Sequence, residues 1–216
     1  MLKPDLALRE LVAAIVAGDA TDVSRLLAAS PALASACFQS GATRQTAKPY
    51  YLDRIERYVF TGDTALHIAA AAYQTEIVRQ LIIAGADVHA KNRLGGEALH
   101  AAAVGRPGSR TWNPPAQAAT IICLIDAGAD PNAIDKGGAS PLHRAVRTRC
   151  AAAVRTLLEY GADSLFPNRS GSTPMLLAIH DTGRGGTGRP RPRRSNKRYC
   201  CCWNSVPRWE LLRAAE

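Results

Sequence analysis

The sequence has few aromatic residues and no long hydrophobic run. Aromatic side chains make up 6% of the 216 residues. No uninterrupted apolar stretch reaches the roughly 18 residues expected of a membrane-spanning helix. Arg9 and Glu10 stand where a signal peptide would place its apolar region. We therefore expect neither a transmembrane helix nor a secretion signal, and we expect the chain to be cytoplasmic.

Motifs for catalysis and for metal binding are also missing. The sequence contains no Walker A motif, no G-x-S-x-G and no pair of C-x-x-C motifs. The glycine-rich residues 183–188 lack the preceding strand and following helix that a phosphate-binding loop needs. We therefore predict that the chain is not an enzyme, and we expect it to hold no cofactor and no metal.

Positive charge is concentrated at the C-terminal end. The chain has 27 Lys and Arg against 18 Asp and Glu, a net charge of +9. Residues 183–216 contain nine of these basic residues and two acidic ones, which gives +7 and leaves +2 for residues 1–182. Hydrophobic residues make up 47% of the chain, which excludes wholesale disorder. The basic balance is therefore weak evidence about what the body of the protein binds.

Two short phrases recur along the body. A box containing an L-H pair in three of its four copies begins at Gly62, Gly95, Gly138 and Gly171, at spacings of 33, 43 and 33 residues. A G-A-D phrase follows the first three boxes, at residues 85–87, 128–130 and 161–163. The second unit is ten residues longer than its neighbours between the two phrases. Such recurrence predicts a stack of similar units.

Each unit has the pattern of two helices joined by a turn. Ser140 and Pro141 suit the cap and the first turn of a first helix. Apolar residues such as Ile77 and Leu81 recur at helical spacing and predict the buried face of a second helix. Glycines stand where the helix end would take a positive φ, at Gly85, Gly128 and Gly161.

These features resemble the ankyrin repeat family, in a bacterial-type form, over residues 62–179. The resemblance implies an all-α, ankyrin-repeat solenoid of stacked helix–turn–helix units with short hairpin fingers. We divide the chain into a degenerate N-terminal capping repeat (1–33), an inserted segment (34–61), a repeat (62–94), a repeat with the ten-residue insertion (95–137), a repeat (138–170), a partial repeat (171–182) and a basic tail (183–216). Residues 50–60 of the inserted segment are predicted to form a short amphipathic helix over the stack.

Three histidines, His67, His100 and His143, recur with the repeat. A zinc site is a poor interpretation, because neighbouring helices lie about 8–10 Å apart and zinc ligands lie about 2 Å from the metal. We predict instead that these side chains bind backbone groups and tie neighbouring repeats together.

The resemblance implies a partner-binding concave face made of the finger tips and the first helices. The residues at the corresponding positions are Tyr73, Arg93, Lys136, Arg144, Arg147, Arg149 and Arg169, where Tyr73 is the counterpart of Arg149. The ten-residue insertion adds Arg106, Arg110 and Trp112 in an exposed loop over 105–115. Two interpretations of each group stay open. Trp112 either recognises a partner or packs on adjacent helices, and the arginines either bind carboxylates or phosphates or form a solvated basic face.

The expected function is non-enzymatic protein–protein recognition by a monomeric scaffold, with a protein partner and no membrane. The tail leaves three alternatives. It is a basic arm that binds nucleic acid or an acidic partner, a cluster at Cys200–Cys202 for metal or lipid, or an out-of-frame end that replaces an expected second helix of the partial repeat.

Overall fold

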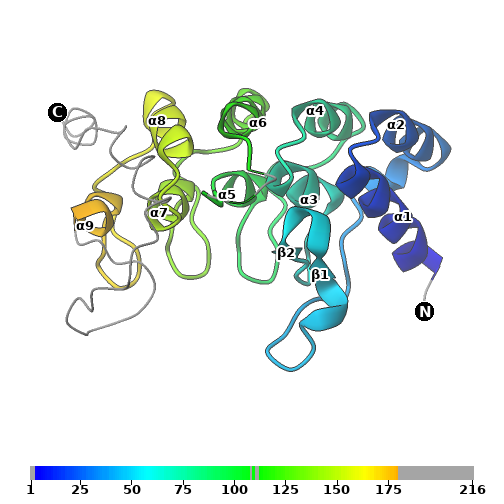
Figure 1. Cartoon of the computed structure of the whole chain (residues 1–216), viewed down its shortest axis with the longest axis horizontal. Helices are drawn as coiled ribbons and strands as arrows, with labels where there is room; N and C mark the ends of the chain where they lie inside the picture. Colours follow the sequence, from blue (N-terminus) through cyan, green and yellow to red (C-terminus); the bar gives the residue numbers. More distant parts are fainter. Residues whose placement is uncertain (1–2, 108, 110–111, 180–216) are drawn as a thin grey trace.

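Two parallel rows of helices form the body of the molecule. A computed structural model describes residues 3–107, 109 and 112–179. The inner row consists of α1 (Lys3–Ala17), α3 (Ala65–Ala71), α5 (Ala98–Ala102), α7 (Pro141–Arg147) and α9 (Pro174–Ile179). The outer row consists of α2 (Ala20–Ala29), α4 (Thr75–Ile83), α6 (Pro114–Asp126) and α8 (Ala151–Glu159). Figure 1 shows both rows and the hairpin loops that project beside the inner row. Over the described residues the chain is an all-α solenoid apart from one small hairpin.

One turn geometry joins the two helices of three units. A left-handed residue stands one or two positions after the end of the inner helix, with φ of 79° at Gly18, 58° at Tyr73 and 56° at Arg149. In each turn the backbone N–H of this left-handed residue donates to the carbonyl three residues back, as Gly18 does to Ile15 at 3.0 Å. The N–H of the next residue donates to the carbonyl five residues back. A shift of 131 residues places Gly18 on Arg149. The α1–α2 pair thus has the same hairpin turn as the later units.

The outer helices end as their glycines predict. Gly85, Gly128 and Gly161 have φ of 92°, 98° and 84°. The following residue donates to a carbonyl of the last turn, as Ala86 does to Leu81 at 2.9 Å. A side chain with a Cβ is disfavoured at such φ values, so glycine marks these three helix ends.

A continuous core runs between the two rows. Each inner helix contacts the next along the stack, and so do the outer helices α2, α4, α6 and α8. The fully buried side chains include Leu11, Leu66, Leu81, Leu99, Leu124, Leu142 and Leu157. Small residues such as Ala69 and Ala102, both 0% exposed, let the inner helices approach closely. Among the described residues, no helix has the length and apolar character needed to cross a membrane.

The helix predicted over residues 50–60 is wrong. The segment forms a 3₁₀ turn η2 (Lys48–Tyr50), strand β1 (Tyr51–Leu52), a second turn η3 (Asp53–Ile55) and strand β2 (Arg57–Tyr58); a further 3₁₀ turn, η1 (Pro31–Ala34), follows α2. The strands are antiparallel, with Tyr51 opposite Tyr58 and their ring centroids 4.7 Å apart. Aromatic cross-strand pairs favour such a ladder. Glu56, with φ of 46°, reverses the chain between the strands.

Several predictions concern parts of the chain outside the described residues. They include the three alternatives for the tail over 183–216, the cysteine triplet Cys200–Cys202 and the candidate binding residue Arg110. They stay predictions.

Truncation of the core should be costly in a stack of this kind. Leu81→Ala is expected to lower the free energy of unfolding by about 2–5 kcal/mol, because a fully buried side chain leaves a cavity between repeats. Ile83, two residues later on α4, is 79% exposed. Ile83→Ala should therefore change the free energy of unfolding by less than about 0.5 kcal/mol. Urea unfolding followed by circular dichroism measures both, and equal losses would contradict the assignment of the core.

Candidate functional site

Backbone hydrogen bonds between adjacent fingers place three basic side chains in equivalent positions. Arg93 N donates to Thr61 O at 2.8 Å, Lys136 N to Leu94 O at 2.9 Å, and Arg169 N to Gly137 O at 3.1 Å. Each bond joins one finger to the preceding turn. The three side chains therefore start from matching points along the edge of the stack.

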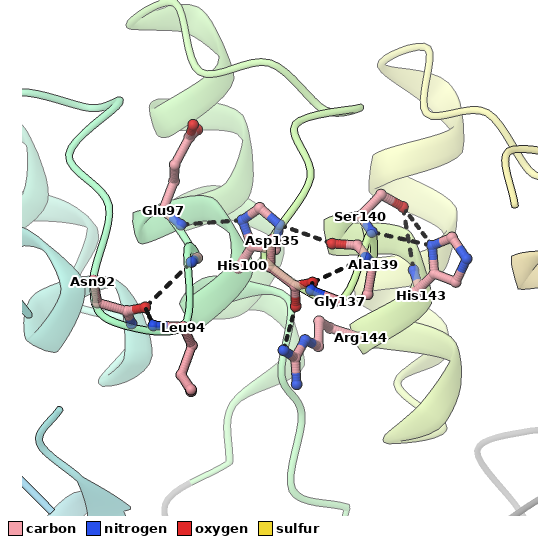
Figure 2. A network of polar contacts seen from close by, with 11 residues as sticks. Asn92, Leu94, Glu97, His100, Asp135, Gly137, Ala139, Ser140, His143 and Arg144 are labelled. Atoms are coloured by element: carbon pink, nitrogen blue, oxygen red, sulfur yellow. Dashed lines mark hydrogen bonds and ion pairs between the residues drawn. The ribbon is translucent and has the colours of Figure 1, made fainter. Parts of the chain in front are cut away.

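An Asx-type turn shapes each finger. The side-chain oxygen of Asn92 accepts from Leu94 N at 2.9 Å and Gly96 N at 3.2 Å. Asp135 and Asn168 make the same pair of bonds in the next two fingers. Figure 2 shows these turns at Asn92 and Asp135. An Asn or Asp side chain at the start of the finger thus satisfies two backbone donors in a short loop.

The repeating histidines bridge neighbouring units, which confirms the prediction. In Figure 2, His100 Nδ1 accepts from Glu97 N at 3.2 Å, and His100 Nε2 lies 3.1 Å from Ala139 O. His67 and His143 repeat this arrangement, with Nε2 3.0 Å from the carbonyl oxygens of Gly96 and Ser172. A carbonyl only accepts, so Nε2 carries the proton. Within the described part of the chain, no group of His, Cys, Asp or Glu has a metal-binding arrangement.

Burial keeps these imidazoles neutral. Desolvation lowers the pKa of His100 to about 4, although its bond to Ala139 O and the charge of Asp135 favour the protonated form. Desolvation by burial also lowers the pKa of His67 and that of His143. A neutral ring has one donor and one acceptor nitrogen, which is what the bridge between repeats requires.

The bridges make stability depend on pH. Below the ordinary histidine pKa of about 6.5, the unfolded chain binds a proton at residue 100 that the folded chain excludes until about pH 4. Stability should therefore be complete above about pH 7 and decline as the pH falls from about 6.5 towards 4.

His100→Gln removes this proton linkage and provides the test. The free-energy advantage of the wild type over the variant should shrink by about 2–3 kcal/mol between about pH 7 and pH 4.5. Urea unfolding at the two pH values measures it. A constant difference would show that His100 is protonated to the same extent in both states.

Three of the candidate arginines are held by the protein itself. Arg144 forms an ion pair with Asp135, which ties the start of α7 to its finger, as Figure 2 shows. Arg93 donates to Ala42 O at 2.7 Å, and its guanidinium lies 5.3 Å from the centre of the Phe60 ring. Arg93 therefore anchors the inserted segment to a finger.

The third arginine joins the two insertions. Arg106, in the loop after α5, donates to Ile55 O and lies 3.6 Å from the Glu56 carboxylate. Arg106, Tyr73 and Trp112 together line a cavity of about 30 Å³, which has room for one or two water molecules.

The two aromatic candidates are also partly enclosed. Tyr73 donates to Val104 O at 2.5 Å, and burial raises the pKa of its hydroxyl. Trp112 donates to Gln117 Oε1 at 2.9 Å, and the fully buried Gln117 donates in turn to Ala102 O at 2.7 Å. This contact is the packing role considered for Trp112. Its indole remains half-exposed.

The other described candidates differ in exposure. Lys136, Arg147 and Arg169 have exposed side chains, and none of the three side chains forms a hydrogen bond or ion pair with another described residue. Arg149 is half-buried at its left-handed turn. The exposed candidate cations that have no partner among the described residues thus lie on two fingers and α7.

Sequence reasoning missed a buried ion pair beneath the inserted segment. Asp63 is fully buried, accepts from Asn92 Nδ2 at 2.8 Å and lies 3.6 Å from Arg57 Nη2. Burial lowers the pKa of Arg57, against the favourable charge of Asp63. Asp63 occupies a position where the later boxes have Gly96, Ala139 and Ser172. A charged residue there was the signal that could have predicted the contact.

Stacked helix hairpins, left-handed turns and bridging histidines define a repeat protein of the solenoid class. Two family models match the chain: "Ankyrin repeat" over residues 61–93 and "Ankyrin repeats (many copies)" over residues 124–178. The chain belongs to the ankyrin repeat family. Ankyrin repeats are generally protein–protein interaction modules, and proteins built of them are generally non-enzymatic.

Similar proteins match a little over half of this chain. "Ankyrin repeat and SOCS box protein 16" of Mus musculus is 36% identical over 116 residues, which cover 54% of this chain and 25% of that protein. Human "B-cell lymphoma 3 protein" is 33% identical over 119 residues, which cover 55% of this chain and 25% of that protein. "Neurogenic locus notch homolog protein 1" of Danio rerio is 29% identical over 141 residues, which cover 54% of this chain and 6% of that protein. The chain thus covers a quarter or less of these three relatives.

Proposed function

We propose that this protein is a non-enzymatic recognition module that binds an acidic surface of a partner protein through its inner face. By inner face we mean the exposed surface of the fingers and the inner helices. The observation that carries the proposal is the set of exposed cations at Lys136, Arg147 and Arg169. Lys136 and Arg169 start from equivalent points on adjacent fingers, so their charges follow the stack.

The neighbouring contacts support this choice of face. Asp135, which precedes the exposed Lys136, forms an ion pair with Arg144, so its negative charge is already neutralised. Burial by itself would raise the pKa of Asp135, but its bonds from Ala139 N and Arg144 hold that pKa below the usual range. The body of the chain is close to neutral, at +2 over residues 1–182. The three exposed cations are therefore a local feature that would favour carboxylates on a partner.

The loop over 105–115 has a supporting role in this proposal. Arg106 is bound to the inserted segment and Trp112 to Gln117, so these two side chains are held in place. Trp112, partly buried beside Tyr73 and Arg106, offers its remaining exposed surface as apolar contact area.

Charge reversal tests the proposed face. Lys136→Glu together with Arg147→Glu should weaken capture of the partner at least about tenfold, because two attractions become repulsions. The measurement is quantitative cross-linking of the purified full chain in extracts of its own cells, at low and at high salt. Wild-type capture should fall as salt rises.

A matched double variant separates this effect from a change in net charge. Arg25→Glu and Arg79→Glu alter exposed residues of α2 and α4 in the outer row. Capture should be unchanged in this control. Retention of the partner by the inner-face variant, or equal loss in both variants, would overturn the proposal.

We also propose that the chain acts as a monomer in the cytoplasm. In the described part of the chain, no disulfide joins Cys37, Cys123 or Cys150 to another cysteine, and cysteines stay reduced in a reducing compartment. Sedimentation at several protein concentrations and fractionation of the source cells test these two points. A concentration-dependent dimer, or recovery in another compartment, would contradict them.

A further inference from the structure

An open apolar groove lies between α1 and the inserted segment, away from the exposed cations Lys136, Arg147 and Arg169. Its volume is about 360 Å³, within the range of ligand-binding pockets. One wall is a face of α1 that includes Val12, Ala13 and Val16, and the other includes Phe38, Tyr50 and Leu52 of the inserted segment. Figure 1 places the inserted segment on the side of the stack that carries the fingers.

The α1 wall is the counterpart of a basic surface further along the stack. The shift of 131 residues that relates the two hairpin turns places Ala13 on Arg144 and Val16 on Arg147. The same helical face is therefore basic on α7 and apolar on α1. Ala13 is exposed and small, which leaves room between α1 and the opposite wall.

The opposite wall is held away from α1 by its own hydrogen bonds. Val59 N donates to Tyr50 O at 2.8 Å, and Ala42 N donates to Val59 O at 2.7 Å. The Tyr50 hydroxyl donates to Ser40 Oγ at 3.0 Å, which fixes the ring that lines the groove. Arg93 attaches the same wall to a finger through Ala42 O. The groove is thus built before any ligand arrives, which lowers the entropic cost of binding.

The charged residues of the lining have one sign. Arg9 and Arg54 line the groove and both are exposed, and no acidic residue belongs to the part of the lining that the structure describes. Neither arginine forms an ion pair with another described residue. A ligand that fits has apolar side chains for the walls and carboxylates for the two guanidinium groups. The chain's own residues 183–216, at +7, have the wrong charge for this site.

We propose that this groove binds an amphipathic acidic peptide segment of a partner protein, with large apolar side chains between α1 and the inserted segment. The inference deepens the proposed recognition function by naming a second contact and its chemistry. It rests on the proposed function only in taking the ligand to be part of a protein.

A defined peptide provides the probe. It is a short fluorescein-labelled helix former with leucine and phenylalanine on one face and glutamate on the other. Fluorescence anisotropy with the full chain should show saturable binding. Replacing every glutamate by lysine, or the apolar residues by serine, should weaken binding at least about tenfold. Absence of saturable binding, or equal binding of the lysine peptide, would overturn the proposal.

Variants of the protein locate the site. Ala13→Trp fills the groove from an exposed position, whereas Ala28→Trp adds the same bulk at an exposed position of α2. The first should abolish peptide binding and the second should leave it unchanged. Arg9→Glu with Arg54→Glu should weaken it at least about tenfold, whereas Arg44→Glu, in the inserted segment but outside the lining, should not. Circular dichroism melts establish that each variant is folded.

Two further outcomes are decisive. Peptide binding that survives Ala13→Trp would place the ligand elsewhere and refute the groove. Concentration-dependent dimerisation that Ala13→Trp abolishes would assign the groove to a second copy of the chain and also overturn the proposal. Lys136→Glu with Arg147→Glu lies outside the lining and should leave peptide binding intact, so failure of the inner-face function and failure of the groove are distinguishable.

Discussion

The structure depends on one constraint: no helix hairpin of this chain can bury its apolar face alone. The outer helices are only nine or ten residues long in three of the four units, too short to be stable in isolation. Each hairpin gains its core from the hairpins beside it, and the histidine bridge adds a directed hydrogen bond from each of α3, α5 and α7 to the next unit. Because these imidazoles must stay neutral, stacking and pH are coupled through the same contacts.

The two insertions change what this regular stack offers to other molecules. The inserted segment after η1 and the loop after α5 meet through Arg106, and Arg93 secures the first of them to a finger. These arginines have a structural role that the regular repeat would not require. The inserted segment, held in this way, forms a wall opposite α1 and encloses an apolar groove at the N-terminal end of the stack. The exposed cations lie further along, on α7 and its fingers.

The candidate site shows why residue type alone is a weak guide to function. Seven of the ten candidate residues are basic or aromatic at positions that face a partner in a regular repeat, and the other three, Arg106, Arg110 and Trp112, belong to the insertion. Arg93, Arg106 and Arg144 have internal partners, whereas Lys136, Arg147 and Arg169 are exposed. An arginine at a surface position binds whichever acceptor the fold brings near it, and for Arg93 and Arg106 that acceptor is a carbonyl of the inserted segment, 51 residues away. Spacing along the sequence carries no information about such acceptors.

The sequence by itself determined the stacked helix hairpins, the positive φ of Gly85, Gly128 and Gly161 and the bridging role of the histidines, because each of these follows from short-range spacing repeated several times. Only the tertiary structure decided the course of residues 50–60, the buried Arg57–Asp63 pair and the apolar groove. Residues 50–60 occur once, so no second copy disclosed their period. Their aromatic residues suit either a helix face or a strand ladder until the contact of Phe60 with Arg93 on the finger and the bond from Val59 N to Tyr50 O select the hairpin.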